Sequence, residues 1–245
     1  MHRFSVAASA AILLTTAWAP AAGATEFRAA AGGWGYHLAG DLDDHGTHYD
    51  FGNDLGLDGH NRKSFQFDFD TPKGWWPDLA ASYSQLGARG STSRSATVGP
   101  ITTTRTIATD ADFDGYDLVA RYPWRWRGLR LAGGVALQQL RGDVVIVDSN
   151  DSAPRREHYD QVFPELHAQA RWRLGGFMTL VGTAQGIEYQ GSRAFEWRTA
   201  AEFRFMQPLL IEFGWQEKRY RIDLTDYQLD ARLSGAIVRV GFLYR

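Results

Sequence analysis

The chain has 245 residues, of which 44% are hydrophobic and 22% are charged, with 26 glycines and no cysteine. This composition excludes an intrinsically disordered chain, a collagen-like repeat and a small disulfide-framed domain. Lysine and arginine together number 26 against 28 acidic residues, and a net charge of -2 gives no electrostatic reason to expect nucleic acid as a partner.

The first 24 residues have the pattern of a secretory signal peptide. A basic start is followed by an apolar run from Val6 to Leu14, and small residues precede the expected cleavage position after Ala24. The apolar run is shorter than the ~20 residues that a membrane-spanning helix needs, which disfavours an anchor. We therefore expect an exported protein in which 1–24 is the signal peptide and 25–245 forms a single domain.

Beyond Thr25 the hydrophobic pattern alternates with a period of two, which is the period of β-strands. In Ser64–Asp70, for example, the aromatic residues Phe65, Phe67 and Phe69 share one face and polar residues share the other. The pattern predicts ten strands, near 28–42, 63–71, 77–89, 107–122, 129–146, 158–173, 177–190, 193–206, 209–223 and 230–244. Pro164 lies inside one of them, and we expect strand pairing to be interrupted there because proline has no N–H to donate.

The connections between these strands alternate in length over most of the chain. The segments 71–77, 123–128, 174–176 and 207–208 are short, whereas 43–62, 90–106 and 147–157 are long. Short turns at one end and long loops at the other are typical of outer-membrane barrels.

Alternation alone fits two environments, a water-soluble sandwich or barrel with its apolar face inward and a membrane barrel with that face toward lipid. Three features favour the membrane barrel. Many strands reach the ~9–11 residues that cross a bilayer at a tilt. Aromatic residues gather at two levels, one of which would include Tyr36, Phe195 and Trp215. The polar face mixes both charge signs. We therefore expect an all-β, antiparallel transmembrane β-barrel of ten strands, with eight as the alternative.

This fold assigns the charged face of the strands to the lumen and the aromatic face to lipid. The expected charged residues of the lumen are His37, Asp68, Asp117, Arg121, Glu165, His167, Arg171, Glu196, Arg198, Glu202, Arg204, Glu212 and Arg239. The expected lipid-facing or girdle residues are Phe65, Phe67, Phe69, Trp172, Phe195, Trp197, Phe203, Phe213, Trp215, Phe242 and Tyr244.

The segment Asp50–Asp58, with the sequence Asp-Phe-Gly-Asn-Asp-Leu-Gly-Leu-Asp, stands out before the aromatic strand 65–69. Together with Ile187–Ser192, Phe213–Arg221 and the closing strand to Tyr244, it resembles a family of proteobacterial outer-membrane β-barrel proteins of uncharacterised function. The resemblance covers essentially the whole chain after residue 24. It implies a barrel fold and an outer-membrane location, and it supplies no catalytic residues.

The first long loop is rich in aspartate and also contains His45, His48 and His60. Carboxylates favour hard cations and histidine adds a transition-metal option, but the spacing matches neither the EF-hand loop nor the His-Glu-x-x-His zinc helix. We expect a solvated outer loop and assign no metal ligand. His48 with Asp50 is the one pair that could serve a hydrolase at the rim.

The sequence thus predicts an integral protein of the Gram-negative outer membrane, with a structural or interaction role and a charged, largely filled lumen. A small-solute pore is the alternative, and a rim-located lipid A or peptide hydrolase is less favoured. A filled lumen predicts that joint neutralisation of Glu202 and Arg204 is tolerated. The expected partners are outer-membrane lipid, lipopolysaccharide and the barrel assembly machinery, with no cofactor and no nucleic acid. The sequence does not indicate an oligomeric state.

Overall fold

The computed structural model describes residues 26–44, 47–55, 57–59, 61–71, 76–98, 101–149, 155–189, 191–224 and 227–244. The expected signal peptide lies outside these ranges, so its cleavage stays a prediction. Within the described residues, no helix is long and apolar enough to cross a membrane.

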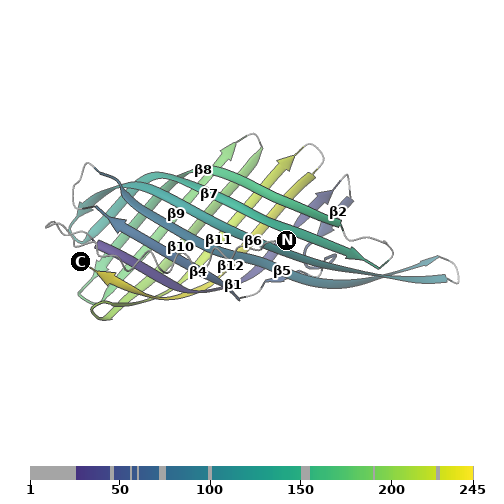
Figure 1. Cartoon of the computed structure of the whole chain (residues 1–245), viewed down its shortest axis with the longest axis horizontal. Coiled ribbons are helices and arrows are strands. Elements are labelled where there is room, and N and C mark those ends of the chain that lie inside the picture. The colour runs from purple at the N-terminus through teal and green to yellow at the C-terminus, as the bar shows by residue number, and fades with distance from the viewer. Residues whose placement is uncertain are drawn as a thin grey trace, which may run out of the picture.

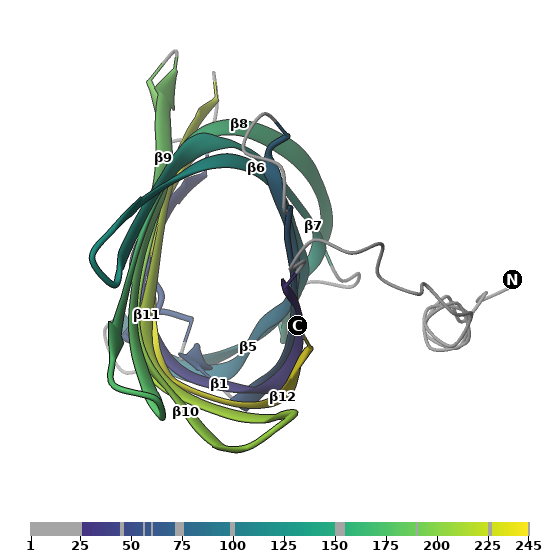
Figure 2. The same cartoon turned by 90° about the vertical axis from the view of Figure 1, so that its left-hand side faces the viewer.

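Ten antiparallel strands form a closed barrel (Figures 1 and 2). The sheet closes because β1 pairs with β4 on one side and with β12 on the other, so that Phe27 lies opposite both Phe69 and Tyr244. The expected fold class is confirmed, with ten strands rather than eight. The barrel strands are β1 (Glu26–Asp44), β4 (Asn61–Asp70), β5 (Asp78–Val98), β6 (Ile101–Trp126), β7 (Leu129–Asp148), β8 (Arg155–Leu174), β9 (Met178–Tyr189), β10 (Ser192–Met206), β11 (Leu209–Leu224) and β12 (Tyr227–Tyr244), and two short strands, β2 (Thr47–Asp50) and β3 (Asp58–Gly59), lie between β1 and β4 in the chain.

The two ends of the barrel differ. The first and last barrel residues, Glu26 and Tyr244, lie at the end where the connections are short, which we call the turn end. Arg127 and Gly128 form one of these turns with positive φ angles of 40° and 85°, as a two-residue hairpin of type I′ requires. The opposite end, where β1 leads into β2 and β7 into β8, is called the loop end.

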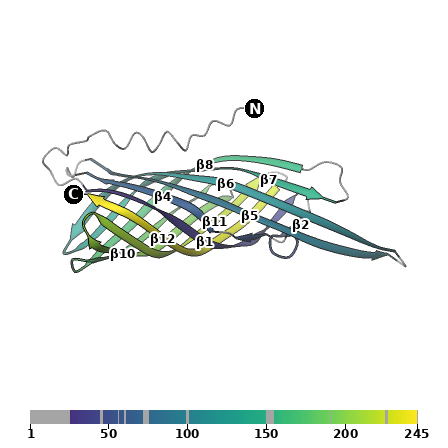
Figure 3. The same ribbon diagram turned by 60° about the horizontal axis from the view of Figure 1, so that its bottom comes forward.

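The prediction of a long loop over 90–106 is wrong, because β5 and β6 occupy most of this segment. The strands β5 and β6 pair continuously from Asp78–Arg121 to Val98–Ile101, and they extend past the other strands as a two-stranded ribbon (Figures 1 and 3). Threonine dominates the distal part of β6, and its β-branched side chain favours strands.

Pairing at Pro164 is interrupted on one side of the strand only. On the β7 side it pairs in register with Leu137, whereas pairing between β8 and β9 begins only at Leu166 opposite Gly186. The missing N–H of the proline therefore falls where β8 no longer has β9 as a neighbour.

The polarity of the two barrel faces inverts along the strands. On the first half of β11, Phe213 and Trp215 are exposed on the outside, while Glu212 and Gln216 are buried inside. Toward the loop end of the same strand, the outward residues are charged and the inward residues Tyr220 and Ile222 are apolar. We call the first part of the barrel the membrane zone and the second part the outer zone.

The same inversion occurs on the neighbouring strand β12. Arg239 is buried in the membrane zone, whereas in the outer zone Arg232 is exposed and Leu233 is buried. An outward apolar belt suits lipid hydrocarbon, and an inward apolar core with a charged surface suits water. The distribution of side chains therefore changes along the strands, from that of a membrane barrel in the membrane zone to that of a water-soluble protein in the outer zone.

Candidate functional site

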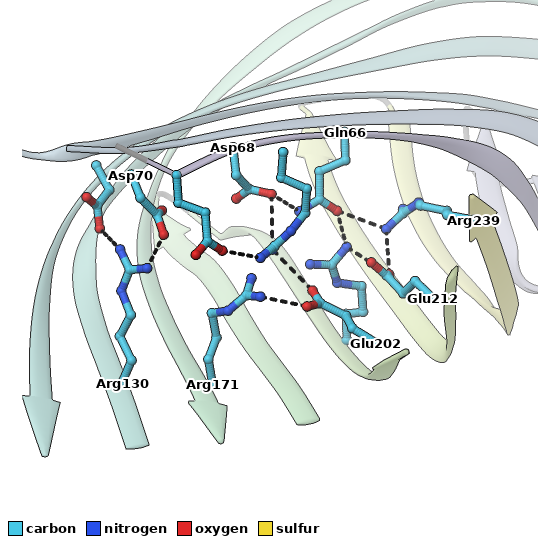
Figure 4. Close-up of polar contacts among 12 residues, drawn as sticks. Gln66, Asp68, Asp70, Arg130, Arg171, Glu202, Glu212 and Arg239 are labelled. Atoms are coloured by element: carbon cyan, nitrogen blue, oxygen red, sulfur yellow. Dashed lines mark hydrogen bonds and ion pairs between the residues drawn. The ribbon is translucent and has the colours of Figure 1, made fainter. Parts of the chain in front are cut away.

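The lumen of the membrane zone is filled by buried ion pairs (Figure 4). Glu202 on β10 is 1% exposed. Its carboxylate lies 2.6 Å from the guanidinium of Arg171 on β8 and 3.1 Å from that of Arg28 on β1. Asp68 on β4 accepts a hydrogen bond of 2.7 Å from Arg121 on β6. These contacts connect β1, β4, β6, β8 and β10 across the lumen.

A second group of the same layer surrounds Glu212 on β11. Its Oε1 atom lies 3.0 Å from Nη1 of Arg239 and 3.5 Å from Nη1 of Arg198. Both arginines also donate hydrogen bonds to the amide oxygen of Gln66. The amide nitrogen of Gln66 donates a hydrogen bond of 2.7 Å to Asp68, so the two groups form one network.

A third polar group lies closer to the outer zone and is centred on Lys218, which is 1% exposed. Its Nζ atom lies 2.8 Å from Glu196 and 3.7 Å from Asp117. Asp117 also accepts hydrogen bonds of 2.9 Å from Gln138 and 3.1 Å from Gln185. Such pairing is what buried charges require.

The turn end of the lumen contains an arginine-rich cavity of about 410 Å³. One of the arginines, Arg130, pairs with both Asp70 and Asp78. The arginines that line this cavity are Arg125, Arg127, Arg130, Arg171, Arg173 and Arg204.

Most of the charged residues expected in the lumen lie there. Ten are buried, namely Asp68, Asp117, Arg121, Glu165, His167, Arg171, Arg198, Glu202, Glu212 and Arg239. Glu196 and Arg204 are half-buried and line lumen cavities. The assignment of His37 is wrong: this side chain is exposed, between buried Tyr36 and Leu38, and it therefore points out of the barrel.

The eleven aromatic residues assigned to the lipid face lie on the outside of the barrel. Phe65, Trp172, Phe195, Phe213, Trp215, Phe242 and Tyr244 are exposed, and Phe67, Phe69, Trp197 and Phe203 are half-buried. The expectation that Tyr36 belongs to an interfacial belt is wrong. Its side chain points into the lumen, where its hydroxyl donates a hydrogen bond of 2.7 Å to the carbonyl of Gly87.

The segment Asp50–Asp58 is folded into the mouth of the barrel rather than solvated as expected. Its aspartates form a turn, in which Asp50 accepts a hydrogen bond of 2.7 Å from the Asn53 N–H. This turn directs Phe51, Leu55 and Leu57 inward, and each is at most 7% exposed. We call residues 51–55 and 57 the capping loop.

The capping loop covers an apolar cavity of about 100 Å³ in the outer zone. The barrel wall contributes side chains from seven strands, among them Leu38 and Leu42 of β1, Leu86 of β5, Leu140 of β7 and Leu233 of β12. The apolar residues around the cavity form the largest buried hydrophobic cluster of the described residues. The outer zone thus offers a preformed apolar site.

The proposed rim pair of His48 and Asp50 is not formed. The Nδ1 atom of His48 instead lies 2.9 Å from Asp43 and 4.0 Å from Asp41, while Asp50 holds the turn of the capping loop. The ligand atoms of His48, Asp41 and Asp43 lie within 4.8 Å of one another on the exposed β1–β2 hairpin. This geometry is that of an ordinary exposed hydrogen bond with a second acid nearby.

Comparison with family models and with curated proteins gives no match. Comparison with solved structures shows similarity to the outer membrane protease OmpT from Escherichia coli, with a TM-score of 0.61 and 8% sequence identity over 89% of this chain and 97% of that chain. The attachment invasion locus protein Ail of Yersinia pestis is more distant, with a TM-score of 0.37 and 10% identity over 90% of this chain and 99% of that one. The outer membrane protein AlkL has a TM-score of 0.40 and 10% identity, covering 94% of each chain.

At such identities the similarity establishes the fold alone. The chain has the fold of an integral outer-membrane β-barrel, and this fold supports a location in the outer membrane.

Two features of the lumen were missed by the sequence analysis. Lys218 lies two residues after the inward residue Gln216 on β11, and both are buried. Continuing the alternation of this strand by one more step would have identified Lys218 as a lumen residue. The inward apolar residues of the outer zone, such as Leu233, could have been found from the inversion of polarity between Arg239 and Arg232 on one strand.

Proposed function

We propose that this protein is a non-conducting outer-membrane barrel with an interaction role carried by its outer zone. The buried ion-pair layer is the observation that supports a closed lumen. Glu202, Glu212 and Arg239 are between 1% and 4% exposed, so side chains occupy the space that a porin leaves to water. A structural or interaction role fits this filled lumen better than solute transport.

The orientation follows from the connections. In outer-membrane barrels the short turns face the periplasm and the longer loops face outward. The outer zone, with the capping loop and its cavity, would then project from the surface of a Gram-negative cell. A molecule in the external medium would meet this part of the protein first.

Conductance across a planar bilayer tests the closed lumen. We expect the wild-type protein to insert without steady single-channel steps. Steady steps whose ion selectivity changes in Arg121→Gln or Arg198→Gln would contradict the proposal and favour the small-solute pore. Arg141→Gln is the matched control, because Arg141 on β7 is exposed on the outer surface.

Lipopolysaccharide is the proposed lipid partner of the outer surface. Four exposed arginines gather on adjacent strands beyond the aromatic residues Phe195 and Trp215, and phosphate groups are strong acceptors for arginine. These arginines are Arg193, Arg219, Arg221 and Arg232. Replacing Arg219 and Arg232 by Gln should weaken copurification of lipopolysaccharide. Insertion by the barrel assembly machinery, common to barrels of this class, is proposed on the fold alone.

A further inference from the structure

The apolar cavity of the outer zone has a wall of nearly pure hydrocarbon. Leucine, isoleucine, valine, alanine, phenylalanine and tyrosine side chains make up most of the lining. None of the described residues that line it carries a charge. A charged ligand would therefore lose its hydration without gaining a counter-charge, whereas an uncharged apolar molecule would be stabilised by leaving water.

One polar atom in this wall has no partner. Thr109 on β6 lines the cavity and is 3% exposed, and its Oγ1 atom makes no hydrogen bond among the described residues. A buried hydroxyl left in this state costs about 1–3 kcal/mol. A ligand that presents one hydroxyl or carbonyl group to Thr109 would recover this energy.

We propose that the cavity under the capping loop binds a small, uncharged, mostly hydrocarbon molecule with a single polar group that hydrogen-bonds to Thr109. The size follows from comparison with an engineered apolar cavity of roughly 150 Å³, which accepts benzene. A cavity of about 100 Å³ suits a short-chain alcohol or ketone. This inference rests on the proposed function in one respect: the proposed orientation of the barrel places the cavity on the side of the external medium. The chemical class of the ligand follows from the cavity wall alone.

The hydrocarbon comes from a free solute rather than from a lipid chain. The cavity lies in the outer zone, where the outward residues Arg219, Arg221 and Arg232 are exposed and charged. Exposed aromatic residues mark the membrane interface in barrels of this kind, and on this basis we place the end of the acyl chains below this level, at the belt that includes Phe213 and Trp215. A lipid chain would have to leave the hydrocarbon region to reach the site, and a small solute would not.

Photolabelling of the full-length protein in lipid nanodiscs tests this site. The probe is azibutanol, a short alcohol with a diazirine whose carbene inserts into adjacent side chains, and labelled peptides are mapped by mass spectrometry. We expect saturable labelling of the capping loop or of the segment around Leu229–Leu233, with competition by excess butanol.

Ala231→Leu, which fills the cavity from β12, should reduce this labelling about tenfold, equivalent to about 1.4 kcal/mol of binding free energy. Ala236→Leu on the same strand faces outward and should leave it unchanged.

Two further variants keep the test decisive. Ala111→Val fills the cavity from β6 if the first variant does not fold, and folding is checked by the heat-dependent shift in gel mobility. Thr109→Val should weaken competition by butanol but not by butane-like probes without a hydroxyl. Equal labelling in wild type and both cavity-filling variants would overturn the proposal. So would labelling that appears only after lipid is stripped from the protein and is blocked by a lysophospholipid. Channel activity in the separate conductance assay would contradict the closed lumen while leaving saturable labelling intact.

Discussion

Replacement of Glu202 by Gln removes one carboxylate from the centre of the ion-pair layer. The guanidinium groups of Arg171 and Arg28 lie 2.6 Å and 3.1 Å from this carboxylate, and all three side chains are at most 8% exposed. Neutralising the acid leaves two buried arginines with less compensation. Breaking a buried pair from one side costs about 3–5 kcal/mol. We expect Glu202→Gln to lower the free energy of unfolding by this amount.

The matched control is Glu188→Gln. Glu188 lies 2.6 Å from Arg193, the same distance as Glu202 from Arg171, but these side chains are 65% and 58% exposed. Water and salt screen such a pair, so its loss costs about 0–1 kcal/mol. The same chemical change is thus made once in the lumen and once on the surface, and burial is the main difference.

The assay is reversible urea unfolding in phospholipid vesicles, followed by tryptophan fluorescence. A double-mutant cycle with Arg171→Gln should show a coupling energy of about 1–3 kcal/mol. Equal losses of stability in Glu202→Gln and Glu188→Gln would refute the argument, because the lumen would then be as hydrated as the outer surface.

Three other predictions follow from the same structure. Gly235→Ala should destabilise the barrel by about 1–3 kcal/mol or more, because its Cβ would lie 1.9 Å from the carbonyl oxygen of Gly35, whereas Gly133→Ala meets nothing within 4 Å and should be near neutral in urea unfolding. Leu55→Ala should cost about 2–5 kcal/mol locally and speed hydrogen exchange of the capping loop, and unchanged exchange would contradict its anchoring role. His48→Ala and the wild type should behave alike toward peptide and lipid A substrates. Hydrolysis that is present in the wild type and abolished in this variant would restore the rim-enzyme hypothesis.

The alternation of side chains predicted the ten barrel strands and the faces of their residues in the membrane zone. The period of two in 63–71 and 193–206 corresponds to β4 and β10, where one face meets the exterior and the other meets the lumen. His37 was misplaced because it lies in the outer zone, where the apolar residues Tyr36 and Leu38 face inward and the polar residue between them faces out. The prediction for 90–106 failed since a polar, threonine-rich segment reads as a loop unless its cross-strand partner is known.

The partners within the lumen could not be predicted. Glu202 and Arg204 occupy inward positions two apart on one strand, and their joint neutralisation was expected to be tolerated. In the structure Glu202 instead pairs across the barrel with Arg171 and Arg28. The tilt and stagger of the strands decide which side chains meet across a closed barrel, and neither quantity is written in a local pattern. Glu202→Gln with Arg204→Gln is therefore expected to be destabilising rather than neutral.

The cavity was hidden by the assumption that one face stays polar along a whole strand. The surroundings of both faces change along a barrel strand that continues past the hydrocarbon region. The outer face passes from lipid to water, and the inner face passes from a lumen of paired charges to an apolar core. On β12 the inward position changes from Arg239 to Leu233 while the outward position changes from Val238 to Arg232. The period of two is preserved through this exchange, so periodicity alone cannot register it. The polarity of each face must be followed level by level, and the level at which it inverts marks both the edge of the membrane and the beginning of the apolar site.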